Sequence, residues 1–185
     1  MKIYCDMDGV LVDLVGGIIK ASKNSLNSEV ITEILSMDWS FRKEHPDPVY
    51  NQALNEIKSS ISDNEAFWAD VLEPMPDALE LWEYICQYHV EILSHPWDFD
   101  SKTGKEFWIY NNLEPRPKNI HLPMDGLKHI HALGEDGTPN ILIDDFHKYI
   151  SKWENAGGIA ITHTSAENSI LELKKVMEIL GEKQN

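Results

Sequence analysis

The chain has 185 residues, 42% of them hydrophobic, and its 16 basic and 31 acidic side chains give a formal net charge of -15. This acidity argues against a nonspecific nucleic-acid or membrane surface, because most of the exterior would repel phosphate groups. Only two cysteines are present, no apolar signal segment opens the sequence, and no run approaches the roughly 20 apolar residues that cross a bilayer. We therefore expect a soluble, cytoplasmic protein with one domain that carries an insertion.

Strand-like and helix-like patterns alternate along most of the chain. The strand-like runs are Lys2–Cys5, Val90–Leu93, Ile120–Leu122, Asn140–Ile143 and Gly158–Ile161. The helical patterns are Ala78–Tyr88, Lys105–Asn112, Phe146–Ala156 and Ser169–Leu180. This alternation predicts an α/β fold with a doubly wound parallel sheet.

The segment after the first strand has a different pattern. Between Val12 and Pro74 we find helical stretches broken by the turn-prone run Glu44–Pro48, and no convincing strand. We interpret residues 14–74 as a small helical cap inserted after the first strand. Residues 1–13 and 75–185 would then form the α/β core.

Acidic residues follow two of the predicted strands. Asp6 and Asp8 follow the first strand, and Asp144 and Asp145 follow the fourth, while Ser94 ends the second. Ligands of open parallel sheets bind beyond the carboxyl ends of the strands. Carboxylates held close together destabilise a fold unless a cation offsets them, and their hard oxygen atoms favour Mg²⁺. The second acidic pair could also cap the helix that follows it, and both roles are compatible.

Three motifs carry a resemblance to a known family. Asp6-Met7-Asp8-Gly9-Val10-Leu11, Ile92-Leu93-Ser94 and Leu142-Ile143-Asp144-Asp145 resemble the haloacid dehalogenase superfamily. More narrowly, the chain resembles the small 5'(3')-deoxyribonucleotidases, because Phe67-Trp68 precedes Glu73-Pro74-Met75-Pro76. The resemblance implies a Mg²⁺-dependent phosphomonoesterase that acts on deoxyribonucleoside monophosphates.

The resemblance also implies roles for single residues. Asp6 would be the nucleophile that forms an aspartyl-phosphate, and Asp8 would protonate the leaving alcohol and then activate water. Ser94 and Lys128 would bind phosphate oxygens, with Lys105 as the alternative lysine. Mg²⁺ would lie between Asp6, the backbone carbonyl of Asp8 and Asp145, with or without Asp144. Phe67 and Trp68 would line the base pocket.

Several alternatives stay open. Phe67 and Trp68 could simply pack the cap, and Lys128 could be a solvated surface lysine. His95 stands where the animal enzymes have a small hydroxyl residue, so the pocket could differ, with Trp97 and Asp98 at its entrance.

The substrate and the class of protein are open as well. The substrate could be a sugar phosphate or, less favourably for so acidic a chain, a nucleic-acid 3'-phosphate. A non-catalytic binding module with the same fold is a further alternative. Zinc is disfavoured, because His121, His129 and His131 lack a supporting Cys or Glu-x-x-His arrangement.

Overall fold

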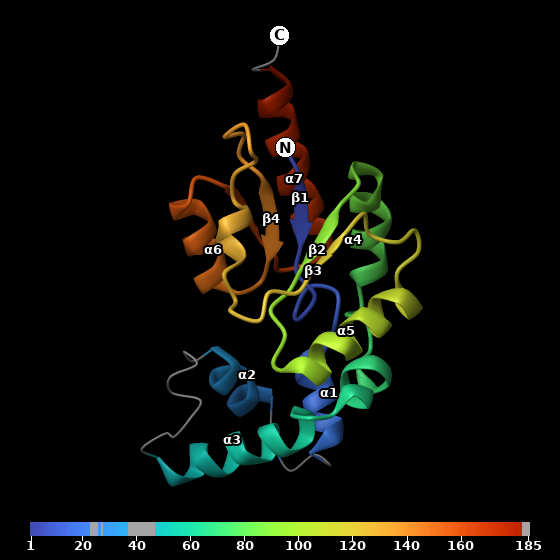
Figure 1. Ribbon diagram of the computed structural model, residues 1–185, viewed down its shortest axis with the longest axis vertical. Helices are drawn as coiled ribbons and strands as arrows, with labels where there is room; N and C mark the ends of the chain where they lie inside the picture. Colours follow the sequence, from blue (N-terminus) through green and yellow to red (C-terminus); the bar gives the residue numbers. More distant parts are fainter. Residues whose placement is uncertain (23–25, 27, 37–46, 183–185) are drawn as a thin grey trace. The chain divides into compact units, whose positions relative to one another are not determined.

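The computed structural model describes residues 1–22, 26, 28–36 and 47–182 (Figure 1). Most of the turn predicted at residues 44–48 lies outside these ranges. Within them, no helix has both the length and the apolar character needed to cross a bilayer. Contacts divide the chain into two compact units, one made of Met1–Val12, Pro74–His95 and Asn112–Asn185, the other of Asp13–Glu73 and Pro96–Asn111.

The first unit contains a parallel sheet of five strands in the order β3-β2-β1-β4-β5 (Figure 1). The strands are β1 (Ile3–Cys5), β2 (Glu91–Leu93), β3 (Ile120–His121), β4 (Ile141–Asp144) and β5 (Ile159–Thr162). All four neighbouring pairs run parallel. The predicted doubly wound α/β sheet is confirmed, and the chain reverses its winding direction between β1 and β4, where such folds bind ligands.

Helices cover both faces of this sheet. They are α4 (Ala78–Ile85), η2 (Cys86–Tyr88), η3 (Lys128–His131), α6 (His147–Asn155) and α7 (Ala166–Glu182). Trp153 of α6 packs in one buried cluster with Tyr4, Leu93, Ala132 and Leu142, so η3 and α6 cover that face. The α4 helix contacts α7, and right-handed crossovers place this pair on the opposite face. Burial on both faces explains why the strands read as nearly continuous apolar runs.

The second unit is helical in the part of the chain that the structure describes. Its elements are α1 (Leu14–Ala21), α2 (Ser28–Ser36), α3 (Pro48–Ile61), the π-helix η1 (Phe67–Val71) and α5 (Phe99–Asn112). The sequence predicted a helical cap at residues 14–74 and assigned α5 to the core, whereas contacts group Pro96–Asn111 with the cap residues.

Helix α5 begins six residues before the predicted Lys105. Its start is set by hydrogen bonds of two side chains and not by an apolar pattern. The carboxylate of Asp98 accepts the Ser101 N–H at 2.8 Å, and the Ser101 hydroxyl oxygen accepts the Asp98 N–H at 2.7 Å. This reciprocal pair satisfies backbone donors that the first helical turn leaves open. Gly104, which weakens the helical pattern, lets α5 approach η1: a Cβ there would lie 2.4 Å from Trp68 Cβ.

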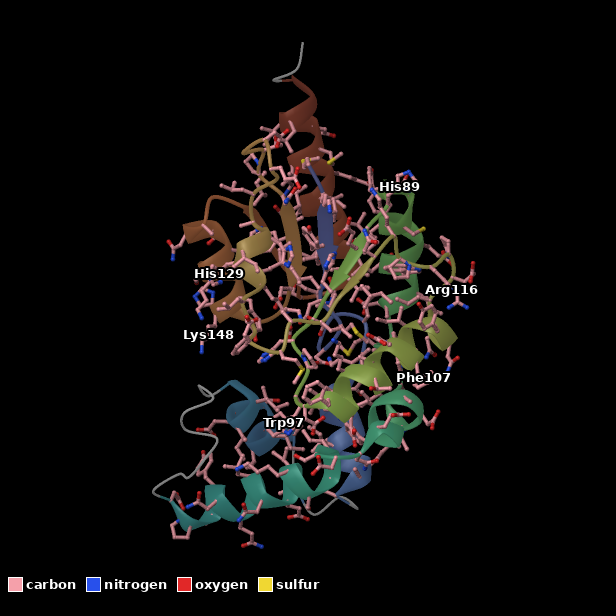
Figure 2. All side chains as sticks on the ribbon, viewed as in Figure 1. His89, Trp97, Phe107, Arg116, His129 and Lys148 are labelled. Atoms are coloured by element: carbon pink, nitrogen blue, oxygen red, sulfur yellow. The ribbon has the colours of Figure 1, made fainter. Side chains whose placement is uncertain are left out.

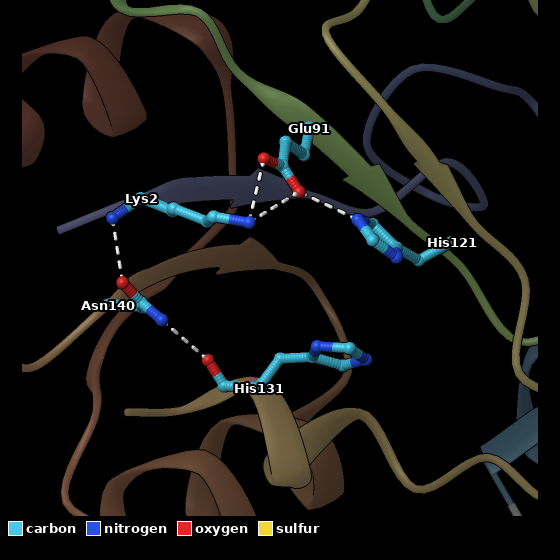
Figure 3. A network of polar contacts seen from close by, with 5 residues as sticks. All are labelled: Lys2, Glu91, His121, His131 and Asn140. Carbon is cyan, nitrogen blue, oxygen red and sulfur yellow. Dashed lines mark hydrogen bonds and ion pairs between the residues drawn. The ribbon is translucent and has the colours of Figure 1, made fainter. Parts of the chain in front are cut away.

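A buried carboxylate lies at the amino end of an inner strand of the sheet, at Glu91 of β2 (Figure 3). Its Oε1 is 3.1 Å from Lys2 Nζ, and its Oε2 is 2.6 Å from His121 Nε2. The Lys2 N–H donates to Asn140 Oδ1 at 2.7 Å, and Asn140 Nδ2 donates to the His131 carbonyl at 2.9 Å. His121 and His131 therefore belong to a polar network that compensates one buried charge.

We expect Glu91→Gln to lower the free energy of unfolding by about 1–2 kcal/mol at neutral pH, because charged hydrogen bonds are lost. Burial works against ionisation, but the bonds from His121 and Lys2 hold the pKa of Glu91 below its ordinary value of 4.5. The stabilisation is complete above pH 4.5 and disappears as the pH falls through the lower folded-state pKa. Urea unfolding at a series of pH values should show the wild-type and Glu91→Gln curves converging in acid. The exposed Glu83→Gln is the matched control, and an equally large effect there would contradict this account.

Candidate active site

Asp6 and Asp144 lie side by side at the carboxyl edge of the sheet. Strands β1 and β4 pair with Cys5 opposite Ile143, and the Asp6 N–H donates to the Ile143 carbonyl at 2.9 Å. The two residues are 5% and 0% exposed. Pairing between parallel strands therefore brings together two carboxylates that are far apart in the sequence.

Asp145 adds a third carboxylate. One oxygen from each of Asp6, Asp144 and Asp145 lies within 4.8 Å of the other two. Asp144 is already engaged on both oxygens, since Oδ1 accepts the Phe146 N–H at 2.9 Å and Oδ2 accepts from Lys128 Nζ at 2.6 Å. Asp144 thus bonds to Phe146, the residue before α6, but no side chain caps the helix itself. Asp145 is the most exposed of the three carboxylates.

Gly9 makes room for Asp145 in the turn after β1. Its φ of +76° lies in the left-handed region, and a Cβ at this position would lie 2.1 Å from Asp145 Oδ2. Three N–H groups fix the turn, because those of Val10, Leu11 and Val12 donate to the Met7 carbonyl at 3.1, 2.8 and 2.9 Å. Both the backbone conformation and the close approach of Asp145 therefore require glycine.

We expect Gly9→Ala to displace the Asp145 carboxylate and to weaken any stabilisation by Mg²⁺. Gly137→Ala is the matched control, because Gly137 has a similar φ of +78° but nothing within 4 Å of the added Cβ. Both variants should lose about 1 kcal/mol from the strained backbone, and only Gly9→Ala should also lose the Mg²⁺-induced rise in Tm. Thermal unfolding with and without Mg²⁺ measures this difference. Equal Mg²⁺ responses in the two variants would show that Gly9 has no part in placing a metal ligand.

Lys128 is the positive charge within this acidic cluster. It is 1% exposed, and its Nζ lies 2.9 Å from Asp6 Oδ1 and 2.6 Å from Asp144 Oδ2. Burial alone would lower the pKa of Lys128, but Asp144 and Asp6 raise it well above its ordinary value. Lys128 is therefore a buried, charged group rather than a solvated surface lysine. The alternative, Lys105, belongs to α5 of the second unit, where its Nζ lies 5.1 Å from the centroid of a Trp68 ring.

One lysine does not neutralise three carboxylates. Burial raises the pKa of Asp144 to about 7, although Lys128 acts to lower it. Although Asp145 is exposed as a residue, partial burial of its carboxyl group, together with the charges of Asp6 and Asp144, raises its pKa to about 8. A divalent cation would favour the ionised form of each. The all-oxygen donor set fits Mg²⁺.

Asp8 and Ser94 come from the loops that follow β1 and β2. Asp8 is half-buried in the turn that contains Gly9, and a β-bridge joins it to Val12. Ser94 is fully buried, and its N–H donates to the His121 carbonyl at 3.1 Å. Both residues lie in the same compact unit as the acidic cluster. Their roles in acid–base chemistry and phosphate binding stay predictions.

Phe67 and Trp68 pack inside the second unit. Each is 1% exposed, their rings meet edge to face at 5.3 Å, and Trp68 Nε1 donates to the Ile61 carbonyl at 2.9 Å. Trp97, labelled in Figure 2, donates from Nε1 to Ser62 Oγ at 2.8 Å. These contacts give the aromatic residues a structural role, and a role in a base pocket stays a prediction.

Tyr149 is a neighbour of Lys128 that the sequence did not reveal. Its ring centroid lies 4.3 Å from Lys128 Nζ. The available signal was its position in the first turn of α6, the helix that follows Asp145.

Comparisons with known proteins agree on the fold. The chain matches no protein-family model and no curated protein. It is similar in structure to a haloacid dehalogenase-like hydrolase from Streptococcus pneumoniae, with a TM-score of 0.60, 19% identity and coverage of 92% of this chain and 89% of that one. A candidate phosphoglycolate phosphatase from Lactobacillus delbrueckii subsp. bulgaricus gives a TM-score of 0.59 and 12% identity, over 87% and 84% of the two chains.

L-2-haloacid dehalogenase from Xanthobacter autotrophicus gives a TM-score of 0.53 and 17% identity, over 87% of this chain and 76% of that one. None of these three structures is named as a deoxyribonucleotidase, so the narrower resemblance stays a prediction.

Proposed function

We propose that this chain, whose fold is that of the haloacid dehalogenase-like hydrolases, is a Mg²⁺-dependent phosphomonoesterase that works through Asp6. The observation that carries the proposal is the cluster of Asp6, Asp144 and Asp145 within 4.8 Å, with the buried Lys128 beside it. Three ionised carboxylates beside one lysine have a net negative charge, and a phosphate ester brings further negative charge. A site of this composition favours a reaction in which a metal ion and an anionic group bind together.

In the first step, an oxygen of the Asp6 carboxylate attacks phosphorus. A bond forms between Asp6 and phosphorus, the bond from phosphorus to the leaving oxygen breaks, and Asp8 transfers a proton to that oxygen. In the second step Asp8 takes a proton from water, the water oxygen attacks phosphorus, and the bond between Asp6 and phosphorus breaks. Inorganic phosphate leaves and the Asp6 carboxylate is restored.

The neighbouring residues would hold the metal and the phosphoryl group in position and balance their charges. Asp6, the Asp8 carbonyl and Asp145 would hold Mg²⁺, while Asp144 accepts the Phe146 N–H and anchors Lys128. Bound Mg²⁺ would reduce the repulsion between these carboxylates and the phosphoryl group. The Lys128 ammonium and the Ser94 hydroxyl would bind phosphoryl oxygens, because phosphoryl transfer needs little beyond alignment and charge stabilisation.

A deoxyribonucleoside monophosphate is our first choice of substrate. The support comes from the motifs shared with the deoxyribonucleotidases, among them the Phe67-Trp68 pair as a sequence motif. The two rings are 1% exposed and pack edge to face, so their geometry adds no argument for base stacking. Another small phosphate ester, such as a sugar phosphate, is the alternative. The net charge of -15 disfavours a nucleic-acid 3'-phosphate end.

The proposal is tested by phosphate release across a panel of deoxyribonucleotides, ribonucleotides, sugar phosphates and an aryl phosphate, with Mg²⁺ or with EDTA. A 2-haloacid belongs in the panel, with halide release as its readout, because one structural neighbour is named for that substrate. Mg²⁺-dependent preference for deoxyribonucleotides is the expected result. Release only from other esters would exclude deoxyribonucleotides as the substrate and leave the proposed reaction at Asp6 unchanged. Failure of every substrate would favour a binding module.

A further inference from the structure

One of the two carboxylates that hold Lys128, that of Asp6, would also hold the metal. Lys128 Nζ contacts Asp6 and Asp144, and both belong to the three-carboxylate cluster. A divalent cation beside carboxylate oxygens would offset part of their negative charge and so weaken their attraction for the ammonium. With metal present, the contact with Asp6 should therefore be weaker, and a further contact that keeps Lys128 in place should use a group that does not bind Mg²⁺.

The ring of Tyr149 is such a group. Its centroid lies 4.3 Å from Lys128 Nζ, and an aromatic face attracts a cation through its quadrupole without offering an oxygen ligand. The ring also lies 5.4 Å from the ring of Phe146 and packs against the core cluster that contains Trp153. Tyr149 is thus fixed on α6 by contacts that are independent of the charges in the site.

His95 joins Tyr149 to the loop that carries Lys128. Its Nδ1 lies 2.8 Å from the Tyr149 hydroxyl oxygen, and its Nε2 lies 3.3 Å from the Met124 carbonyl oxygen. A Cβ on Gly126 would lie 3.0 Å from the His95 ring, and the Lys128 N–H donates to the Gly126 carbonyl at 2.9 Å. His95 therefore contacts both the ring beneath the ammonium and the backbone just before Lys128.

We infer that Tyr149, oriented by His95, is a positioning residue that holds the Lys128 ammonium at the phosphate site when metal is bound. The inference deepens the proposed function and rests on it for the part that concerns turnover. Its structural part, the placement of the ammonium over the ring, can be measured without any substrate.

The first test is the ¹H–¹⁵N NMR signal of the Lys128 ammonium group, recorded with and without Mg²⁺ and assigned by its loss in Lys128→Arg. Protons over an aromatic face are shifted upfield by the ring current. We expect this shift in the wild type under both conditions, its retention in Tyr149→Phe and its loss in Tyr149→Leu. The matched control is Tyr84→Leu, which removes a tyrosine whose ring lies 5.2 Å from the exposed Lys174 Nζ. An unshifted Lys128 signal, or one too rapidly exchanging to observe in the wild type, would overturn the inference.

The second test is steady-state kinetics with the best ester of the panel. Tyr149→Leu should lower kcat/KM by about tenfold, mainly through kcat, while Tyr149→Phe should stay within about twofold because it keeps the ring. His95→Ala should have a smaller effect in the Tyr149→Phe background than in the wild type, because the hydroxyl through which it acts is absent. Tyr84→Leu should match the wild type.

The two tests separate the inference from the proposed function. If the wild type releases phosphate but Tyr149→Leu keeps its kcat/KM, the inference fails and the function stands. If no ester is hydrolysed, the function fails, and with it the claim about turnover. The NMR shift then decides the structural part alone.

Discussion

Asp6→Asn is expected to lower Mg²⁺-dependent phosphate release by at least about a thousandfold while the fold is kept. An amide has nearly the volume of the carboxylate but is a far weaker nucleophile. The backbone bond from the Asp6 N–H to the Ile143 carbonyl is unaffected by the change. Loss of one negative charge beside Asp144 and Asp145 should also relieve repulsion, so stability without metal should not fall sharply.

Phosphate release by the purified variant, with thermal unfolding as the check on folding, measures this effect. Asp13→Asn is the matched control: Asp13 caps α1 by accepting the Gly16 N–H at 2.8 Å, and asparagine caps helices equally well. The control should keep wild-type activity. Residual activity of Asp6→Asn within about tenfold of the wild type would exclude Asp6 as the nucleophile.

Lys128→Met should remove activity and also destabilise the metal-free protein by about 3–5 kcal/mol, because it leaves buried carboxylates without their cation. Lys128 is 1% exposed and contacts both Asp6 and Asp144, so solvent cannot easily replace its charge. Mg²⁺ at the cluster can replace part of that charge. We therefore expect Mg²⁺ to raise the Tm of Lys128→Met by more than it raises that of the wild type.

Lys105→Met is the matched control for this experiment. Lys105 is also fully buried, but it lies against Trp68 in the second compact unit. Loss of the Lys105 charge should reduce stability without changing the rise in Tm that Mg²⁺ causes. Equal Mg²⁺-induced rises in Tm in the two variants would show that Lys128 and the metal do not share a carboxylate.

The sheet and the meeting of Asp6 with Asp144 could be predicted because they depend on local patterns and a general rule. Apolar runs indicated the strands, and the carboxyl ends of parallel strands lie at one edge. The resemblance selected Lys128 over Lys105, and the structure places Lys128 in the acidic cluster.

Other features depend on contacts that a linear pattern does not contain. The start of α5 depends on side-chain bonds between Asp98 and Ser101, and the approach of α5 to η1 requires Gly104. The place of Tyr149 beneath Lys128 depends on how η3 and α6 pack, which sequence spacing alone does not specify. His121 and His131 lack a metal-binding pattern in the sequence, but in the structure His121 contacts the buried Glu91 and the His131 carbonyl accepts from Asn140 in the same network.

The most direct test of the central claim is chemical trapping of the Asp6 intermediate. The protein is mixed with Mg²⁺ and its best ester, quenched with borohydride, and analysed by peptide mass spectrometry, because hydride reduces an acyl phosphate but not a free carboxylate. The account predicts reduction of Asp6 to homoserine, dependent on both Mg²⁺ and ester. Reduction at another carboxylate, or no reduction in a preparation that shows a burst of the leaving alcohol before steady state, would contradict it.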